Sequence, residues 1–182
     1  EVQEEACPLG LAPTSSTTAT LAMGDALAIA LLQAKGFTRD DFALSHPGGS
    51  LGRKLLLKVD DVMHKGDDLP IVHNDICITE TLYEISKKGL GMTAVVDSET
   101  TLVGIFTDGD LRRVIDAEVN LRTTPIAQVM TQNCVTCPSG ILAAQALQIM
   151  DEKSINGLIV VNEKHQPIGA LNMLDMVKAG VI

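Results

Sequence analysis

The chain has 182 residues, a formal net charge of −9, 46% apolar residues and only 2% aromatic residues. This length allows one or two compact domains. The core has to be built from aliphatic side chains, which suits helices packed on buried strands. Lys and Arg cluster at most in short pairs, whereas nucleic-acid binding needs a basic face, so we expect no nucleic-acid partner. Four cysteines do not make a disulfide scaffold in a chain of this size.

An apolar stretch near the N-terminus, residues 21–34, lies inside a predicted helix over residues 19–35. The side chains of residues 15–18 can cap the start of this helix, and Gly36 ends it. Because the helix is apolar on most sides, it has to be buried on most sides. Residues 1–56 cannot supply that cover alone. Either they are the end of a domain whose start is missing, or a partner chain covers the helix.

The same apolar stretch bears on localisation. It is interrupted by Asp25 and Gln33, and it is shorter than the roughly 20 apolar residues that span a bilayer. The chain also opens on acidic residues rather than on the basic start of a secretory leader. We therefore expect a cytoplasmic protein with no membrane partner.

The rest of the chain consists of two copies of one small βα unit, residues 57–118 and 119–182. From Leu82 onward the copies align at a constant offset of 65 positions. The matching segments are helices near residues 82–85 and 146–150, strands 93–97 and 158–162, strands 102–106 and 167–171, and last helices that start at residues 108 and 173. Self-similarity through several elements marks a repeat. Such a unit cannot bury its own apolar faces, so we expect the copies to pack face to face and leave two related clefts.

One motif stands where a strand gives way to a helix in the first copy. It runs from Gly104 to Asp110 and includes Thr107. A glycine lets a ligand approach the backbone, helix N-terminal amides favour a phosphate, and the Asp110 carboxylate can accept hydrogen bonds from ribose hydroxyls. The alternative is that Thr107 simply caps the helix. Because the motif lies within a repeat, we favour the ligand-binding interpretation.

Paired units that each close in Gly-x-x-Thr-x-x-Asp resemble a tandem CBS (cystathionine-β-synthase) domain pair, also called a Bateman module. By this resemblance the fold is α/β (α+β), the clefts bind adenosine nucleotides or related ligands, and Thr107 and Asp110 contact the ligand. The second copy departs from the pattern, because Asn172 stands where Thr is expected, while Asp175 is kept. The resemblance therefore predicts Asp175 as a ligand contact in a cleft that has an altered specificity or is empty.

Cys134 and Cys137 form a C-x-x-C pair that is followed at once by Pro138. A redox pair needs a lowered thiol pKa at a helix N-terminus, and a structural zinc site needs two further ligands. No second C-x-x-C pair is present in the sequence. By the CBS resemblance the pair lies in the short extended stretch that opens the second repeat. We expect no metal site and no cofactor for catalysis.

Two further residues carry chemistry in the N-terminal segment. His46 lies in a loop, residues 45–53, whose glycines and proline give it a defined shape. A histidine there can act as a general acid or base near neutral pH, although the residues alone favour a surface histidine in a linker. Glu5 alone is most simply a solvated carboxylate near an acidic chain end.

A second resemblance changes both interpretations. Residues 5–14, 23–28 and 45–52 resemble the end of a sugar isomerase (SIS) domain. A SIS domain followed by a CBS pair is the layout of the D-arabinose-5-phosphate isomerase family, which interconverts D-ribulose 5-phosphate and D-arabinose 5-phosphate. The product feeds the synthesis of Kdo, a sugar of lipopolysaccharide. The resemblance implies that residues 1–56 are the C-terminal remnant of a SIS α/β domain, and that Glu5 and His46 are catalytic.

A carboxylate and an imidazole can share the proton transfers of an enediol isomerisation. The resemblance also implies that the phosphate-binding loop of the enzyme precedes Glu1, so we expect this chain alone to be inactive. It further implies a sugar-phosphate substrate for the full enzyme, a homodimer or homotetramer, and a regulatory ligand such as AMP, ATP or CMP-activated Kdo. The alternative is a free-standing nucleotide sensor without a catalytic role.

Overall fold

The computed structural model describes residues 2–38, 41 and 56–182. The chain divides into two compact units, residues 1–45 and 46–182. His46 and the rest of its predicted loop lie outside the described residues, so the catalytic role of His46 stays a prediction.

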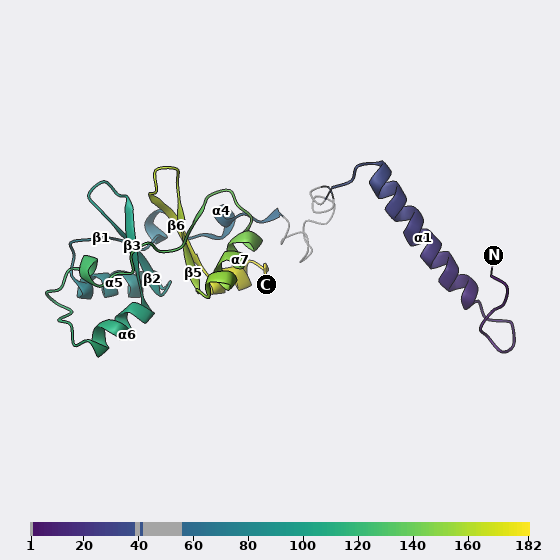
Figure 1. Ribbon diagram of the computed structural model, residues 1–182, viewed down its shortest axis with the longest axis horizontal. Helices are drawn as coiled ribbons and strands as arrows, with labels where there is room; N and C mark the ends of the chain where they lie inside the picture. Colours follow the sequence, from purple (N-terminus) through teal and green to yellow (C-terminus); the bar gives the residue numbers. More distant parts are fainter. Residues whose placement is uncertain (1, 39–40, 42–55) are drawn as a thin grey trace. The chain divides into compact units, whose positions relative to one another are not determined.

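The first unit contains one long helix, α1 (Ser15–Ala34) (Figure 1). It begins before the predicted start at residue 19, because the residues expected to cap the helix are part of it. The hydroxyl of Thr18, for example, donates to the carbonyl of Thr14 one turn back (3.1 Å). The predicted end is confirmed: Gly36 follows the last turn with a φ of +62°, a left-handed conformation that favours glycine.

Within this unit, α1 is uncovered. Its side chains from Thr17 onward are exposed. The large apolar ones among them are Leu21, Met23, Leu27, Ile29, Leu31 and Leu32. The whole helix α1, with 20 residues and an 18-residue window of mean hydropathy 1.3, is longer than the apolar stretch within it and could cross a membrane by length and composition. A core helix of a larger soluble domain meets the same two criteria.

The second unit contains both repeats, whose strands and main helices recur at the offset of 65 positions (Figure 1). The first repeat comprises α4 (Val59–Val62), the 3-10 turn η1 (Gly66–Asp68), β1 (Ile71–His73), α5 (Ile78–Lys88), β2 (Met92–Val96), β3 (Leu102–Thr107) and α6 (Asp108–Asp116). The second comprises the 3-10 turn η2 (Ile126–Gln128), β4 (Thr136–Pro138), α7 (Ala143–Lys153), β5 (Gly157–Val161), β6 (Pro167–Asn172) and α8 (Met173–Lys178). The predicted strands and helices are confirmed, and β1, which was not predicted, extends the alignment back to Ile71.

Each repeat forms a three-stranded sheet, β1-β2-β3 and β4-β5-β6. The first two strands are parallel, because a helix connects them, and the last two form an antiparallel hairpin. Oδ1 of Asp97 in the first hairpin and Oδ1 of Asn162 in the second each accept hydrogen bonds from two backbone amides of their own turn, at 2.9–3.0 Å. The same turn is thus built twice from related side chains.

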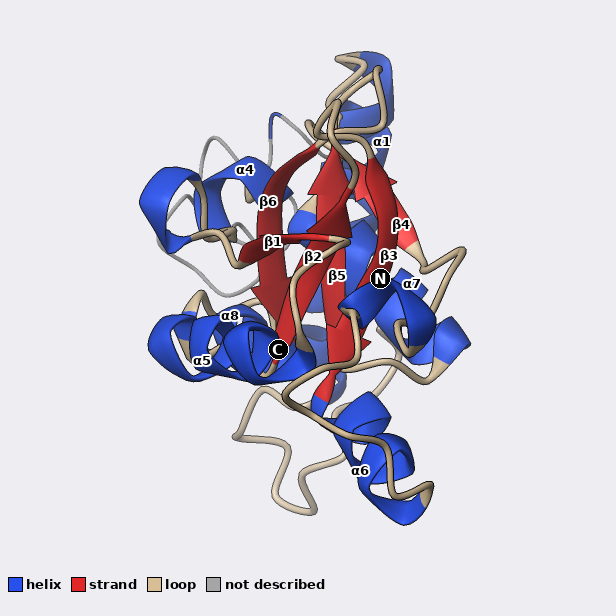
Figure 2. Ribbon diagram, turned by 90° about the vertical axis from the view of Figure 1, so that its left-hand side faces the viewer, coloured by secondary structure: helices blue, strands red, loops and turns tan. Residues whose placement is uncertain are grey.

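The two sheets pack against each other through small and branched side chains. Ala94 and Ile105 of the first sheet share one buried cluster with Ile159 and Ala170 of the second. In Figure 2 the strands lie at the centre of this unit and the helices lie outside them. The predicted face-to-face packing of the repeats is confirmed.

Each repeat also gives its opening segment to the other repeat. Val59 of α4 is fully buried in the core of the second repeat, and its amide donates to the carbonyl of Ile141 (3.0 Å). Ile126 of η2 is fully buried in the core of the first repeat, and its amide donates to the carbonyl of Ile76 (2.8 Å). The repeats are therefore interlocked, and each completes the core of its neighbour.

Gly104 and Gly169 lie where these opening segments cross the hairpins. A Cβ at Gly104 would lie 2.7 Å from Sδ of Met130 and 2.9 Å from the carbonyl oxygen of Thr131, and a Cβ at Gly169 would overlap Sδ of Met63. On the side where a Cβ would stand, the space beside Gly104 is filled by protein. The residue is small because the other repeat passes directly over it.

Candidate ligand-binding cleft

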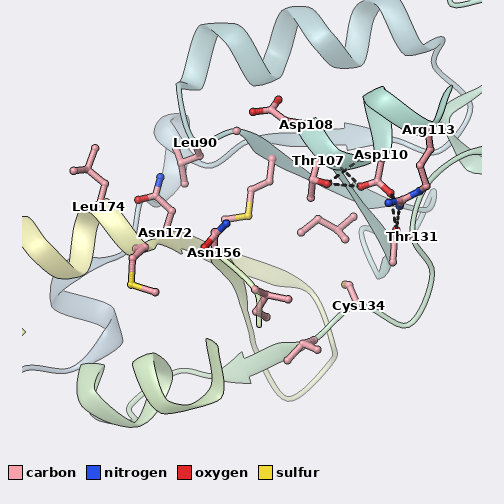
Figure 3. Close-up of a pocket in the computed structure, with 18 of the residues that line it drawn as sticks. Leu90, Thr107, Asp108, Asp110, Arg113, Thr131, Cys134, Asn156, Asn172 and Leu174 are labelled. Atoms are coloured by element: carbon pink, nitrogen blue, oxygen red, sulfur yellow. Dashed lines mark hydrogen bonds and ion pairs between the residues drawn. The ribbon is translucent and has the colours of Figure 1, made fainter. Parts of the chain in front are cut away.

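A cavity of about 680 Å³ opens between the two repeats (Figure 3). This volume is in the range that holds a small-molecule ligand. The first repeat lines it with the segment before β2 and with the junction of β3 and α6, and the second with the segment before β4 and the junction of β6 and α8. Its lining includes Leu90, Gly91, Met92, Thr107, Asp108, Asp110, Arg113, Thr131, Asn133, Cys134, Asn156, Asn172, Met173 and Leu174.

Thr107 and Asp110 form a reciprocal cap at the start of α6. The backbone amide and the hydroxyl of Thr107 both donate to Oδ2 of Asp110, at 2.8 and 2.6 Å. The amide of Asp110 donates to the Thr107 hydroxyl at 3.3 Å. The capping interpretation of the motif is therefore realised in the fold, and the same two residues face the cleft.

The second oxygen of Asp110 joins the two repeats. Oδ1 accepts a hydrogen bond from the hydroxyl of Thr131 (2.7 Å) and pairs with the guanidinium of Arg113. The carboxylate is only 2% exposed, so both of its oxygens are engaged inside the protein. A ribose hydroxyl that reached Asp110 would have to share it with Arg113 or Thr131. Figure 3 shows these side chains gathered at one part of the cleft.

Arg113 and Thr131 were not predicted as site residues. Arg113 follows Asp110 by three positions on α6, which places both side chains on one helix face. This spacing could have been read from the sequence. Thr131 comes from the opening segment of the other repeat, and only the exchange of segments brings it to Asp110.

The second repeat builds the same cap from Asn172 and Asp175. The amide of Asn172 donates to Oδ2 of Asp175 (2.9 Å), and the amide of Asp175 donates to the side-chain oxygen of Asn172 (3.1 Å). Asn172 therefore replaces threonine as a cap residue without loss of the motif. Asn172 lines the cleft. Asp175 is 8% exposed, and its other oxygen, Oδ1, lies 3.1 Å from Nε2 of His64.

The two cysteines of the C-x-x-C pair are both free. Cys134 lines the cleft, and burial raises the pKa of its thiol. Burial, together with the nearby charge of Asp60, raises the pKa of the Cys137 thiol to about 11. A raised thiol pKa is the opposite of what a redox pair needs. Among the described residues, no group of three or more His, Cys, Asp or Glu side chains is arranged to hold a metal ion.

Glu5, in the N-terminal unit, caps the start of α1. Its Oε2 accepts hydrogen bonds from the amide and the hydroxyl of Thr14 (2.7 and 2.9 Å) and from the amide of Ser16 (3.3 Å). The Ser16 side chain and then the Thr14 amide lower the pKa of Glu5 from 4.5 to about 2. Glu5 is thus held as a carboxylate at neutral pH, and its predicted catalytic role stays a prediction.

The sequence model of the CBS domain family matches residues 59–117 and 126–181, which is most of the interlocked unit. The chain belongs to the CBS domain family. The predicted tandem CBS pair is confirmed by this match and by the fold. Each matched segment begins with the short element that packs into the core of the other repeat, which is α4 in the first segment and η2 in the second.

The chain is also 58% identical over 181 residues to an arabinose 5-phosphate isomerase of Pseudomonas aeruginosa, and 54% identical over 182 residues to one of Escherichia coli. The matches cover 100% of this chain but 56% and 55% of these relatives. The chain therefore spans about half the length of the relatives it matches, in their C-terminal part.

Solved structures of CBS pairs share the fold. One is the CBS domain pair of protein MJ0100 in complex with 5′-methylthioadenosine and S-adenosyl-L-methionine, with 23% identity, a TM-score of 0.59, and coverage of 66% of this chain and 97% of that one. Another is CBSX2 in complex with AMP, with 21% identity, a TM-score of 0.60, and coverage of 69% and 96%. At these identities the likeness concerns the fold.

Proposed function

We propose that the CBS pair, residues 57–182, is a regulatory module that binds a nucleotide or nucleotide sugar in the cleft. The observation that carries this proposal is that the start of α6, with Thr107 and Asp110, borders a cavity with walls from both repeats. Amides in the first turn of a helix favour a phosphate group. Apolar walls suit a base, and the amide side chains of Asn133, Asn156 and Asn172 can bond to its polar edge.

The ligands of solved relatives support the same class of compound. MJ0100 was crystallised with 5′-methylthioadenosine and S-adenosyl-L-methionine, and CBSX2 with AMP. For this chain the candidate ligands are AMP, ATP and the pathway product CMP-activated Kdo. Thr107 and Asp110 are the proposed contacts of the first repeat. Asp175 is the proposed contact of the second, although its carboxylate lies beside His64 and not in the lining of this cavity.

We further propose that the chain is the C-terminal part of an aldose–ketose isomerase that interconverts D-ribulose 5-phosphate and D-arabinose 5-phosphate. The identity to isomerases along the whole chain supports this proposal. Residues 1–56 are then the end of a SIS domain, whose remaining part would cover the exposed face of α1. In that domain Glu5 and His46 share the proton transfers. The full enzyme is a cytoplasmic homodimer or homotetramer.

Titration calorimetry of the chain with AMP, ATP and CMP-activated Kdo tests the binding proposal. We expect heat of binding with at least one ligand, and a weaker affinity after Asp110→Asn, which removes the charge that holds Arg113 and Thr131 at the cleft. The matched control is Asp116→Asn, because Asp116 is exposed at the other end of α6. The absence of heat with all three ligands would contradict the proposal.

An activity assay tests the isomerase proposal separately. The 182-residue chain should not convert ribulose 5-phosphate, whereas a protein extended upstream by the rest of the SIS domain should. In the extended protein, substitution of Glu5 by Gln or of His46 by Ala should abolish turnover without global unfolding. Turnover by the present chain alone would overturn the assignment of residues 1–56 as a remnant.

A further inference from the structure

The charges that line the cleft are few and unbalanced. Among the described lining residues, only Asp108, Asp110 and Arg113 carry carboxylate or guanidinium side chains. Arg113 pairs with Asp110, so these two charges largely cancel at close range. Asp108 remains without a cation of the lining beside it. The lining therefore carries one acid more than it has bases.

Asp108 is held at the edge of the cleft by its own backbone. It is the first residue of α6, and its amide donates to the carbonyl of Gly91 (3.2 Å). Its Oδ2 would lie 3.2 Å from a Cβ at Gly91. Gly91 has a φ of +70°, which disfavours a side chain that could screen the carboxylate. In Figure 3 Asp108 stands apart from the cluster of Thr107, Asp110, Arg113 and Thr131.

The acid belongs to one side of the cleft only. The corresponding residue of the second repeat, 65 positions later, is the apolar Met173, which also lines the cavity. The other polar groups of the lining are uncharged amides and hydroxyls, which suit a base and a ribose. For a phosphate the cleft offers Arg113, which also pairs with Asp110, and the start of the nine-residue helix α6, where the amides of Asp108 and Asp110 already donate to Gly91 and Thr107. These groups are enough for one phosphate.

We propose that the cleft selects nucleotides with a single phosphate or phosphodiester group and discriminates against triphosphates, and that Asp108 is the residue that does so. This inference rests on the proposed nucleotide-binding function. Each further phosphate adds negative charge within a Debye length of Asp108, and the described lining has no second cation to balance it. Because Asp108 is exposed, water screens the repulsion, and its effect is a moderate factor in affinity.

Calorimetry in the presence of a chelator of divalent cations compares AMP with ATP and CMP with CTP. We expect the monophosphate of the bound pair to bind about tenfold more tightly than its triphosphate, which corresponds to about 1.4 kcal/mol. Asp108→Asn should lower the ratio of monophosphate affinity to triphosphate affinity by about threefold to tenfold, chiefly by tighter binding of the triphosphate. Asp116→Asn makes the same change in net charge away from the cleft and should leave the ratio unaltered.

A salt series provides a second measurement that needs no variant. As ionic strength rises from about 0.05 M to about 0.5 M, the ratio should narrow in the unaltered chain, because salt screens the repulsion. A triphosphate that binds as tightly as its monophosphate, or a ratio that responds neither to Asp108→Asn nor to salt, would overturn the selectivity and leave the binding function intact. If none of the four nucleotides binds, this inference fails, and the titration with CMP-activated Kdo decides separately whether the proposed binding function holds.

Discussion

Nε2 of His64 lies 3.1 Å from Oδ1 of Asp175, so a side chain from the opening segment of the first repeat reaches the nearly buried carboxylate of the second. Thr131 holds the matching place in the other direction, with its hydroxyl 2.7 Å from Oδ1 of Asp110. Both aspartates therefore cap their own helix with one oxygen and bind the neighbouring repeat with the other. The motif that predicts a ligand site also fastens the two repeats together.

Substitution of His64 by Ala should lower the stability of the CBS pair. It leaves Oδ1 of Asp175 without its cross-repeat partner, and a lost hydrogen bond of this kind costs about 1 kcal/mol. His64→Thr, which copies Thr131, should lose less than the Ala variant. His73→Ala changes an exposed histidine and serves as the control. Urea denaturation measures these differences, and equal free energies of unfolding for His64→Ala and the unaltered chain would refute the cross-repeat role.

Substitution of Gly104 by Ala should destabilise the pair by about 1–3 kcal/mol, because the new Cβ collides with Met130 and with the backbone of Thr131. Gly109→Ala is the matched control from the same motif, since a Cβ there would meet only Oγ1 of Thr107, at 3.5 Å. Thermal unfolding should separate the two variants clearly. If Gly104→Ala melts together with Gly109→Ala, the close crossing of the opening segment is not what requires the glycine.

Removal of the Thr107 hydroxyl by substitution with Val should weaken the start of α6. The variant loses the acceptor of the Asp110 amide and a donor to the Asp110 carboxylate, at a cost of about 1–2 kcal/mol. Thr107→Asn copies Asn172 of the second repeat and should retain most of the stability, because asparagine caps α8 there. Chemical denaturation is the measurement. A Val variant more stable than the Asn variant would contradict the role of the cap.

The Glu5 carboxyl should titrate far below its ordinary range, because the Ser16 side chain and the Thr14 amide lower its pKa from 4.5 to about 2. A lowered pKa means that the ionised form favours the folded turn. This contribution is fully present above about pH 4.5 and is lost as the pH falls towards 2. NMR of the Glu5 carboxyl carbon and of the Thr14 amide should follow this transition. A midpoint near 4.5 would show that Glu5 does not cap α1.

Glu5→Gln complements the titration at constant pH. Glutamine has a weaker acceptor, so the start of α1 should fray, and exchange of the Thr14 and Ser16 amides with solvent should accelerate. Glu4→Gln removes a neighbouring exposed acid and is the control. Equal exchange rates in the two variants would contradict the cap.

The sequence by itself determined the repeat, its strands and main helices, and the place of the Thr107–Asp110 motif. It could do so because periodic patterns and capping residues act over a few neighbouring positions. Because the offset between the copies is constant, each strand or helix predicted in one copy also predicted its counterpart in the other. The short strand β1 was not predicted, because a three-residue segment is too short to show a recognisable alternation of apolar and polar residues.

Only the tertiary structure decided which repeat each opening segment completes, and therefore why Gly104 is a glycine and why Thr131 belongs to the cleft. These contacts join residues far apart in the chain, and no local pattern encodes them. The same holds for the isolated acid Asp108, whose neighbours at the cleft come from both repeats. The effect of the Asp108 charge depends on which residues lie around it in the folded protein, and here those residues come from both of the interlocked repeats.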